Sequence, residues 1–309
     1  MASAGVITVD LHKESDPIEF GGFRWVADGT GLEDGWELCC DPAKDGETVM
    51  WNCLFTAEFA FEVPNGRKAV YHVVDGFLQQ DACPILFLQW DPNAFRKARQ
   101  IAIRNSNKSL RTRVSIKIVE SFIADLADPK NALIEDPADA FMVKVGSDEL
   151  YLSRKVLSFH SKFFEVLFNE DFKEKTEDPY ELEDVELVTF VKFLAIIHGL
   201  RVSITPSAVE FVLELGDSYQ CKTVMNRCEE YLRRVQDVED LSMYHQVFGP
   251  GDIEAVRQIE KFSLANKFGL NQLLMETVEK ISMEKLEEFP ESEMSEFAKE
   301  LIAMKRALC

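Results

Sequence analysis

The sequence predicts an α+β multidomain protein with an N-terminal antiparallel β-sandwich, a central α/β block and a C-terminal helical extension. Apolar and polar residues alternate with period two in the first third. Strand and helix patterns lie close together between residues 139 and 232, and apolar residues then recur at helical spacing. These shifts divide the chain into a flexible N-terminus at 1–16, a sandwich at 17–123, a linker at 124–137, a central domain at 138–233 and a helical extension at 234–309.

The clearest strand pattern of the N-terminal third begins at Trp51. One side of this segment is apolar and the other is mostly polar, which indicates a half-buried strand. Pro64-Asn65-Gly66 then predicts a hairpin turn, with residues 70–74 as the return strand. A similar alternation at 112–118 places basic and apolar side chains on opposite faces. Several short strands separated by turns are typical of an antiparallel sandwich. The apolar side of the first strand is Trp51, Cys53, Phe55, Ala57, Phe59, Phe61 and Val63.

The central block begins with a predicted hairpin and continues with a helix. Alternating apolar residues at 141–145, the turn cluster Gly146-Ser147-Asp148 and an apolar run at 150–152 predict two paired strands. Ser153 then occupies the position of a helix N-cap. The residues that follow at helical spacing are Val156, Leu157, Phe163, Phe164, Leu167 and Phe168.

The C-terminal extension contains a short internal repeat. Residues 264–270, with the apolar positions after them, echo residues 215–221, and both segments predict a helix, a short turn and a second helix. We therefore expect the extension to continue the helical stack of the central block. A last amphipathic helix around 294–304 either covers apolar surface or binds a partner.

Composition excludes several classes of function. The 309 residues carry a formal net charge of −20, with a pI near 4.7, and such a field repels nucleic acid and anionic lipid. The seven cysteines include no Cys-x-x-Cys pair, which favours reduced thiols in a reducing compartment. We find no signal peptide and no apolar run long enough to span a membrane, so we expect a cytoplasmic or nuclear protein.

No catalytic or metal-binding pattern stands out. Gly216-Asp217-Ser218 resembles a hydrolase motif, but it lies inside a helical pattern without a matching base. The five histidines are widely spread, none at the spacing of zinc ligands. We therefore predict that the protein is not an enzyme and needs no cofactor or metal.

The central block resembles a BTB (POZ) domain. That family has an Asp near its first strand, where Asp139 stands, followed by a run that residues 153–164 (SRKVLSFHSKFF) match, with Ser153 in place of the usual His. Residues 182–199 and 204–232 resemble its later strand and helices. The resemblance implies a homodimer, and the residues expected at its interface are Asp139, Val156, Leu157 and Phe159.

The N-terminal third resembles a divergent MATH domain. Phe20-Gly21-Gly22-Phe23-Arg24-Trp25 is similar to the Gly-Gly-aromatic-x-Trp entry of that family, and MATH-BTB chains place the two domains in this order. A MATH domain is an antiparallel sandwich that binds short segments of other proteins. The resemblance therefore implies an unidentified protein substrate for the N-terminal domain.

BTB domains that recruit a cullin scaffold carry a hydrophobic-x-Glu signature after their first long helix, which Phe172-Lys173-Glu174 fits. Phe172 would fill a pocket and the Glu174 carboxylate would fix the orientation. The resemblance implies a substrate-recruiting adaptor of a cullin-based ubiquitin ligase. The alternative is a self-associating BTB scaffold in transcriptional or cytoskeletal complexes, without ubiquitin chemistry.

One basic stretch opposes the acidic composition. Residues 92–119 contain eight Lys or Arg residues and no acidic residue. They form either a solvated sheet face and loop, or a docking face for an acidic partner or an acidic segment of the chain itself. Arg111 and Arg113 would belong to that face.

Overall fold

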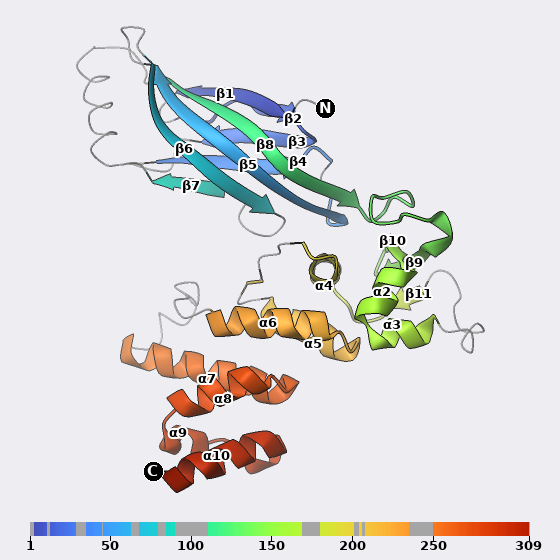
Figure 1. The fold of residues 1–309 in the computed structure, drawn as a ribbon, viewed down its shortest axis with the longest axis vertical. Coiled ribbons are helices and arrows are strands. Elements are labelled where there is room, and N and C mark those ends of the chain that lie inside the picture. The colour runs from blue at the N-terminus through green and yellow to red at the C-terminus, as the bar shows by residue number, and fades with distance from the viewer. Residues whose placement is uncertain are drawn as a thin grey trace. The chain divides into compact units, whose positions relative to one another are not determined.

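The computed structural model describes residues 3–10, 13–28, 35–44, 46–62, 68–79, 85–89, 111–168, 180–200, 204–205, 208–234 and 250–308. The chain forms two compact units, which are Met1–Leu152 with Leu200–Ser203, and Ser153–Gly199 with Ile204–Cys309. In Figure 1 the first unit runs from blue to green, and the second continues to red at the C-terminus.

The first unit contains two four-stranded antiparallel sheets, which confirms the predicted sandwich. One sheet has the order β1-β8-β5-β6, with β1 at Ala4–Asp10, β8 at Arg111–Asp125, β5 at Val49–Glu62 and β6 at Lys68–Gln79. The other has the order β2-β3-β4-β7, with β2 at Ile18–Phe20, β3 at Phe23–Asp28, β4 at Gly35–Pro42 and β7 at Ile85–Gln89.

Aromatic rings join the two sheets at the centre of the sandwich. The ring centroids of Phe23 and Trp51 are 5.6 Å apart, and those of Trp25 and Phe55 are 5.0 Å apart, both in edge-to-face geometry. The ring of Phe20 stacks on that of Trp25, with centroids 5.3 Å apart. The Gly-Gly-aromatic-x-Trp segment therefore supplies the aromatic centre of the core.

Residues 4–10 form a strand, although we expected a flexible N-terminus at 1–16. β1 pairs with β8 over seven residues, from Ala4 opposite Lys117 to Asp10 opposite Arg111. Ile7 and Val9 are buried in the same core as the aromatic residues. Backbone hydrogen bonds to β8 and the burial of two apolar side chains at alternate positions together stabilise this short edge strand.

The alternation predicted for the two long strands is confirmed where side chains are described. Trp51 to Phe59 on β5 and Val114 to Ile118 on β8 put alternate residues into the core. The register between these strands shifts at Leu54/Phe55, a β-bulge that leaves Val119 unpaired and exposed. The turn Pro64-Asn65-Gly66 lies outside the described residues.

The linker at 124–137 is bound to the structure that follows it. β8 ends at Asp125, and the turns after it bury Leu126 and Asn131. The backbone amide of Tyr151 donates to the Leu126 carbonyl at 2.7 Å, and the Asn131 amide donates to the Tyr151 carbonyl at 3.0 Å. A 3-10 turn at Pro137–Asp139 then leads into β9 (Ala140–Val145) and β10 (Asp148–Ser153), the predicted hairpin.

The second unit is a stack of helices with one short strand. α4 packs on α5 and α6, α5 packs on α7, α6 on α8, and α8 on α10 (Figure 1). The C-terminal extension thus continues the helical stack, as predicted. The elements are α2 (Arg154–His160), α3 (Lys162–Leu167), β11 (Tyr180–Leu182), α4 (Leu187–Ile197), α5 (Val209–Ser218), α6 (Lys222–Arg234), α7 (Pro250–Phe268), α8 (Asn271–Lys280), α9 (Met283–Glu287), a 3-10 turn (Glu291–Glu293) and α10 (Glu296–Leu308).

The helix predicted after Ser153 is broken into two. Ser153 caps α2 as expected, since its side chain accepts from the Val156 amide at 3.1 Å. Ser161 has an extended backbone, with φ −129°, and its hydroxyl caps α3 by accepting from the Phe164 amide at 3.2 Å. A serine that caps a new helix competes with helical continuation, and helical spacing of the apolar residues does not reveal the break.

The internal repeat is confirmed, and the turns of its two copies are closed by equivalent hydrogen bonds. The α5–α6 turn closes with a bond from the Cys221 amide to the Gly216 carbonyl, and the α7–α8 turn with one from Leu270 to Ala265. The residue before each donor is left-handed, with φ 48° at Gln220 and 64° at Gly269. Both helices therefore end in the same capping motif, one with the favoured glycine and one without it.

Exchange of these two residues is expected to have opposite effects on stability. Gln220→Gly should raise the free energy of unfolding by about 0.5–1 kcal/mol, because glycine adopts the left-handed region without steric strain. Gly269→Gln should lower it by about 1 kcal/mol, although nothing lies within 4 Å of an added Cβ. Urea unfolding of both variants checks the prediction, which fails if the two shifts have the same sign.

Candidate interaction surfaces

The predicted dimer residues differ in their accessibility within one chain. Phe159 is 84% exposed on α2, whereas Leu157 is only 1% exposed and belongs to the core. Val156 and Asp139 are half-buried. Phe159 is thus the apolar side chain of this set that a partner can reach directly. The cullin-contact candidates Phe172 and Glu174 lie outside the described residues.

Tyr219 contacts α3 and α4, and its carbonyl accepts a hydrogen bond from Ser161 at the end of α2, the helix that carries Phe159. The Ser161 hydroxyl, which also caps α3, donates to the Tyr219 carbonyl at 2.6 Å. The ring of Tyr219 lies between those of α3 and α4, with centroids 5.1 Å from Phe164 and 5.5 Å from Phe193. Sequence spacing did not identify this contact, because it joins positions 58 residues apart.

Two histidines lie at the same part of the helical stack. The His160 ring nitrogen Nδ1 is 3.1 Å from the Thr223 hydroxyl on α6. Burial at the end of α4, together with the nearby His160, lowers the pKa of His198 to about 4. His198 is therefore neutral in the folded protein at pH values where an unfolded chain already begins to protonate it.

The unfolding free energy should fall as the pH is lowered from 6.5 to 4. Because the folded-state pKa of His198 lies below its unfolded value, its contribution is present above pH 6.5 and is lost below that pH. We expect a loss of about 1–3 kcal/mol from this group. Subtracting the unfolding free energy of His198→Asn from that of wild type at each pH separates the contribution of His198 from that of the carboxylates. A difference that does not change with pH would contradict the prediction.

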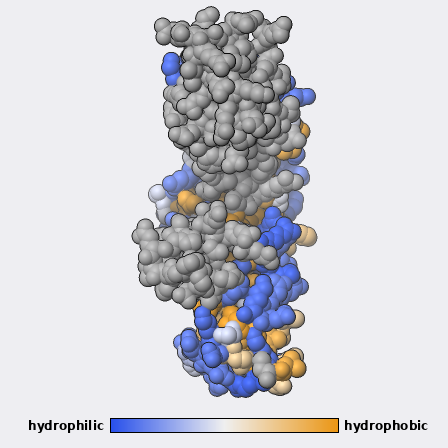
Figure 2. Space-filling model, turned by 90° about the vertical axis from the view of Figure 1, so that its left-hand side faces the viewer, coloured by the Kyte–Doolittle hydropathy of each residue, from blue (hydrophilic) through white to orange (hydrophobic). Residues whose placement is uncertain are grey.

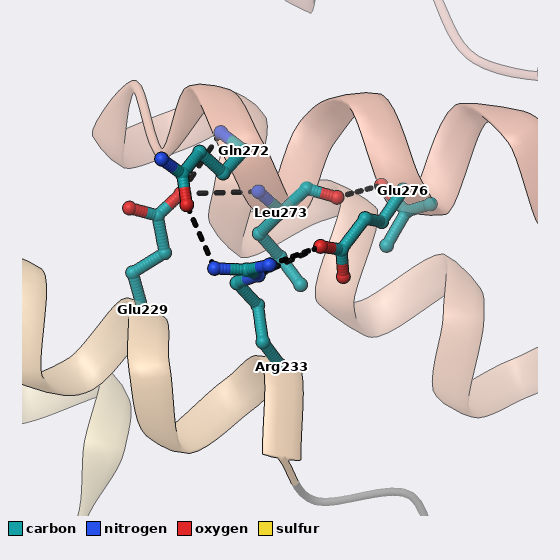
Figure 3. A network of polar contacts seen from close by, with 6 residues as sticks. Glu229, Arg233, Gln272, Leu273 and Glu276 are labelled. Carbon is teal, nitrogen blue, oxygen red and sulfur yellow. Dashed lines mark hydrogen bonds and ion pairs between the residues drawn. The ribbon is translucent and has the colours of Figure 1, made fainter.

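A polar network joins α6 to the N-terminus of α8 (Figure 3). One oxygen of Glu229 accepts from the backbone amides of Gln272 and Leu273, both at 3.0 Å. Arg233, one turn later, donates to the side chains of Gln272 and Glu276, both at 2.7 Å. A carboxylate is favoured at the positive end of a helix dipole, so Glu229 acts as an N-cap supplied by another helix.

Removal of this cap should weaken the helical stack. Glu229→Ala leaves two amides of α8 without their acceptor, and we expect a loss of about 1–2 kcal/mol in unfolding free energy. The neighbouring Glu230→Ala is the matched control, because Glu230 pairs with Arg227 and Arg234 at the surface, and its loss should cost less than about 0.5 kcal/mol. Chemical unfolding followed by circular dichroism measures both, and equal losses would refute the capping role.

The other end of α8 is bound by α10. The ammonium of Lys305 donates to the carbonyls of Val278 at 2.6 Å and Glu279 at 2.9 Å, and also to Ile281. The predicted amphipathic helix therefore covers apolar surface, since its Ile302 and Ala298 are buried. Its other face keeps Met304 and Leu308 exposed, and Figure 2 shows hydrophobic residues near the lower end of the view, where Figure 1 places the C-terminal helices.

The outer face of the β1-β8-β5 sheet is hollowed. A depression of about 400 Å³ is lined by residues of the three strands, among them Val6, Glu58, Ser115 and Lys117. Of the predicted basic face, Lys117 is exposed and Arg113 is half-buried on β8, whereas residues 92–110 lie outside the described residues. Glu58 stands in register with Ser115 beside these cations, so the described part of the face carries both signs of charge.

The hydrolase-like triplet has a structural explanation. Gly216 is buried in α5, where an added Cβ would lie 3.0 Å from Val224 of α6, so the glycine permits close helix packing. Among the described residues, no group of three or more His, Cys, Asp or Glu side chains is placed to hold a metal ion. Within that same part of the chain, no helix has both the length and the apolar character that a bilayer requires.

Comparison with known proteins agrees with this architecture. Residues 137–236 match the family model of the BTB/POZ domain. The chain is 29% identical over 246 residues to BTB and MATH domain-containing protein 36 of Caenorhabditis elegans, covering 74% of each chain. It is 25% identical over 205 residues to protein 38 of the same series in that nematode, covering 64% of this chain and 51% of the relative.

A second group of relatives shares one region alone. Kelch repeat and BTB domain-containing protein 1 of Ectromelia virus is 24% identical over 90 residues, which are 29% of this chain and 16% of the viral protein. The chain also spans only about half the length of the nematode protein 38. The names of these relatives have the BTB domain in common.

Proposed function

Because the chain has a BTB/POZ domain at 137–236 and is similar over most of its length to BTB and MATH domain-containing proteins, we propose that it is a substrate-recruiting adaptor of a cullin-based ubiquitin ligase. The sandwich, proposed at 17–123 and extended by β1, would bind a target protein. The BTB domain at 138–233, behind the linker at 124–137, would dimerise and hold the cullin. The helical extension at 234–309 would widen that contact.

The exposure of Phe159 is the observation that favours self-association. The Phe159 ring, 84% exposed on a short helix that also carries the half-buried Val156, leaves apolar area that a two-fold contact would remove from water. Ser153 caps this helix, and the Ser161–Tyr219 bond fixes its far end. Phe159 therefore projects from a helix whose two ends are both held by hydrogen bonds.

Sedimentation of the full chain tests the proposed dimer. Phe159→Asp should shift the molecule towards a single copy, because a charge in an apolar two-fold contact is repeated on both sides. Phe211→Asp is the control, since Phe211 is also an exposed phenylalanine, 56% accessible, but belongs to a different helix, α5. A wild-type chain that stays a single copy at high concentration would remove the proposal.

Cullin binding is tested with the residues that the family signature indicates. Phe172→Ala combined with Glu174→Ala should abolish capture of a purified cullin scaffold, while Phe211→Ala should not. Normal capture by the double variant would reject this site. A wild-type dimer that captures no cullin would instead favour the self-associating scaffold without ubiquitin chemistry.

A further inference from the structure

The strand β1 leaves one edge of its sheet open. It lies at the end of the order β1-β8-β5-β6, and no other described strand pairs with it (Figure 1). The Ser3 carbonyl accepts from the Ile118 amide at 2.8 Å, so the odd-numbered residues of this segment bond to β8. Backbone groups alternate in direction along a strand, and Ala4, Val6 and Thr8 therefore point their N–H and C=O groups away from β8. The side chains of these three residues are exposed on the outer face of the sheet.

This edge lacks the features that prevent a strand from pairing with another chain. β1 is seven residues long, keeps a regular register with β8 throughout, and has neither a charged residue nor a proline between Ala4 and Val9. Charges, prolines, bulges and short length are the features that protect edge strands. The other edge strands are shorter or charged, since β2 has three residues, β7 has five, and β6 contains Lys68 and Asp75. The β1 edge therefore predicts a strand partner.

We propose that β1 pairs antiparallel with β1 of a second copy of the chain, with Val6 opposite Val6 across a two-fold axis. In this register Ala4 lies opposite Thr8 of the second copy, so each outward-facing residue meets another and exchanges both of its backbone hydrogen bonds with it. The three residues are evenly spaced about Val6, and this symmetry makes a second copy the occupant that fits the edge. The proposal goes beyond the adaptor role and does not depend on it.

The side chains on the outer face are compatible with this register. Val6 is 43% exposed in the single chain, and opposed valines on one face of a strand pair remove each other from water. The described cations stand one strand further in, Lys117 beside Ala4 and Arg113 beside Thr8. In the paired sheet these two cations of different copies lie three strand spacings apart, roughly 14 Å, which exceeds the Debye length of about 8 Å at physiological ionic strength. The contact therefore brings no like charges into direct opposition.

The experiment uses the full chain with Phe159→Asp, which removes the other proposed contact between copies. Sedimentation is measured over a range of concentrations in moderate salt, because the net charge of −20 opposes association. We expect a reversible dimer. Val6→Lys should raise its dissociation constant by about tenfold or more, since two like charges then stand directly opposite each other. Val119→Lys is the matched control, because Val119 is also an exposed valine but belongs to β8 rather than to the edge strand, and the dissociation constant should not change.

A charge exchange separates loss of the contact from loss of the fold. An equal mixture of Val6→Lys and Val6→Glu chains, both carrying Phe159→Asp, should associate again, because opposite charges then face each other across the axis. Each of the two variants alone should remain a single copy at the same concentration.

Amide hydrogen exchange supplies a readout for single residues. The amides of Val6 and Thr8 should exchange quickly in dilute Phe159→Asp protein and slowly in concentrated protein, because only association gives them an acceptor. The amides of Gly5, Ile7 and Val9 point to β8 and should be protected at both concentrations.

The outcomes distinguish this contact from the proposed BTB dimer. A wild-type dimer that becomes a single copy at every concentration with Phe159→Asp would overturn β1 pairing and leave the BTB dimer standing. Association that resists Val6→Lys, or a Lys–Glu mixture that stays as single copies, would also overturn it. Loss of a bound target protein in Val6→Lys, without any association between copies of the Phe159→Asp chain, would assign the edge to a strand of another protein instead.

Discussion

Replacement of Trp25 by Ala is expected to lower the free energy of unfolding of the sandwich by about 3–5 kcal/mol. The side chain is 0% exposed, and its ring contacts Phe20, Phe23 and Phe55. Its removal leaves a large cavity at the point where the two sheets meet, and the surrounding rings cannot collapse into that space without losing their edge-to-face contacts. Urea unfolding followed by far-UV circular dichroism measures the loss.

Trp25→Phe separates volume from polarity. The indole Nε1 is buried without a hydrogen-bond partner among the described residues, and an unpaired buried donor is costly. Phenylalanine keeps most of the ring contacts and removes that donor, so we expect this variant to lose only about 1 kcal/mol. Similar losses for the Ala and Phe variants would contradict this prediction, because the ring contacts that phenylalanine keeps would then contribute nothing to stability. Association through the second unit should be unchanged in both.

Tyr219→Ala should have an effect of the same size on the second unit, about 3–5 kcal/mol. Its ring is in contact distance of four phenylalanine rings, at centroid separations of 5.1–6.3 Å, from α3 and α4. Loss of the ring separates these helices from α5. Because α2 and α3 share the Ser161 cap, the variant should also lose any binding that depends on Phe159.

Tyr219→Phe is the control for the hydroxyl. Burial raises the pKa of Tyr219 to about 12, so the phenol is neutral throughout the physiological range. The Phe variant should stay within about 1 kcal/mol of wild type below pH 9. It should also be more stable than wild type between pH 10 and 12, where the unfolded chain ionises Tyr219 and the folded chain does not. A Phe variant as unstable as the Ala variant would contradict the packing role.

The sequence predicts the elements of this protein better than their ends and junctions. The alternation around Trp51 and at 112–118 identified two central strands, because one face of each strand is buried and a change of register would expose it. The break at Ser161 and the strand at 4–10 were missed. In both places a long-range partner, Tyr219 or β8, decides between conformations that local sequence permits equally.

The interaction surfaces were predictable only in part. The family resemblance directed attention to Phe159, which is exposed, and to Leu157, which packs inside its own chain. Helical spacing alone does not separate these two residues, because α2 has fewer than two full turns in which to define a buried face. Glu229 was not recognised as a cap, because the helix that it caps begins 42 residues later.

The position of α8 between Glu229 and Lys305 has a consequence for how the C-terminal half responds to stress. Glu229 of α6 accepts from the first amides of α8, and Lys305 of α10 donates to its last carbonyls, so α8 cannot fray without losing contacts to both of these helices. The array should therefore melt as a single cooperative block, since each element depends on the adjacent ones. Proteases that attack the C-terminal helix should find few sites until the whole block opens.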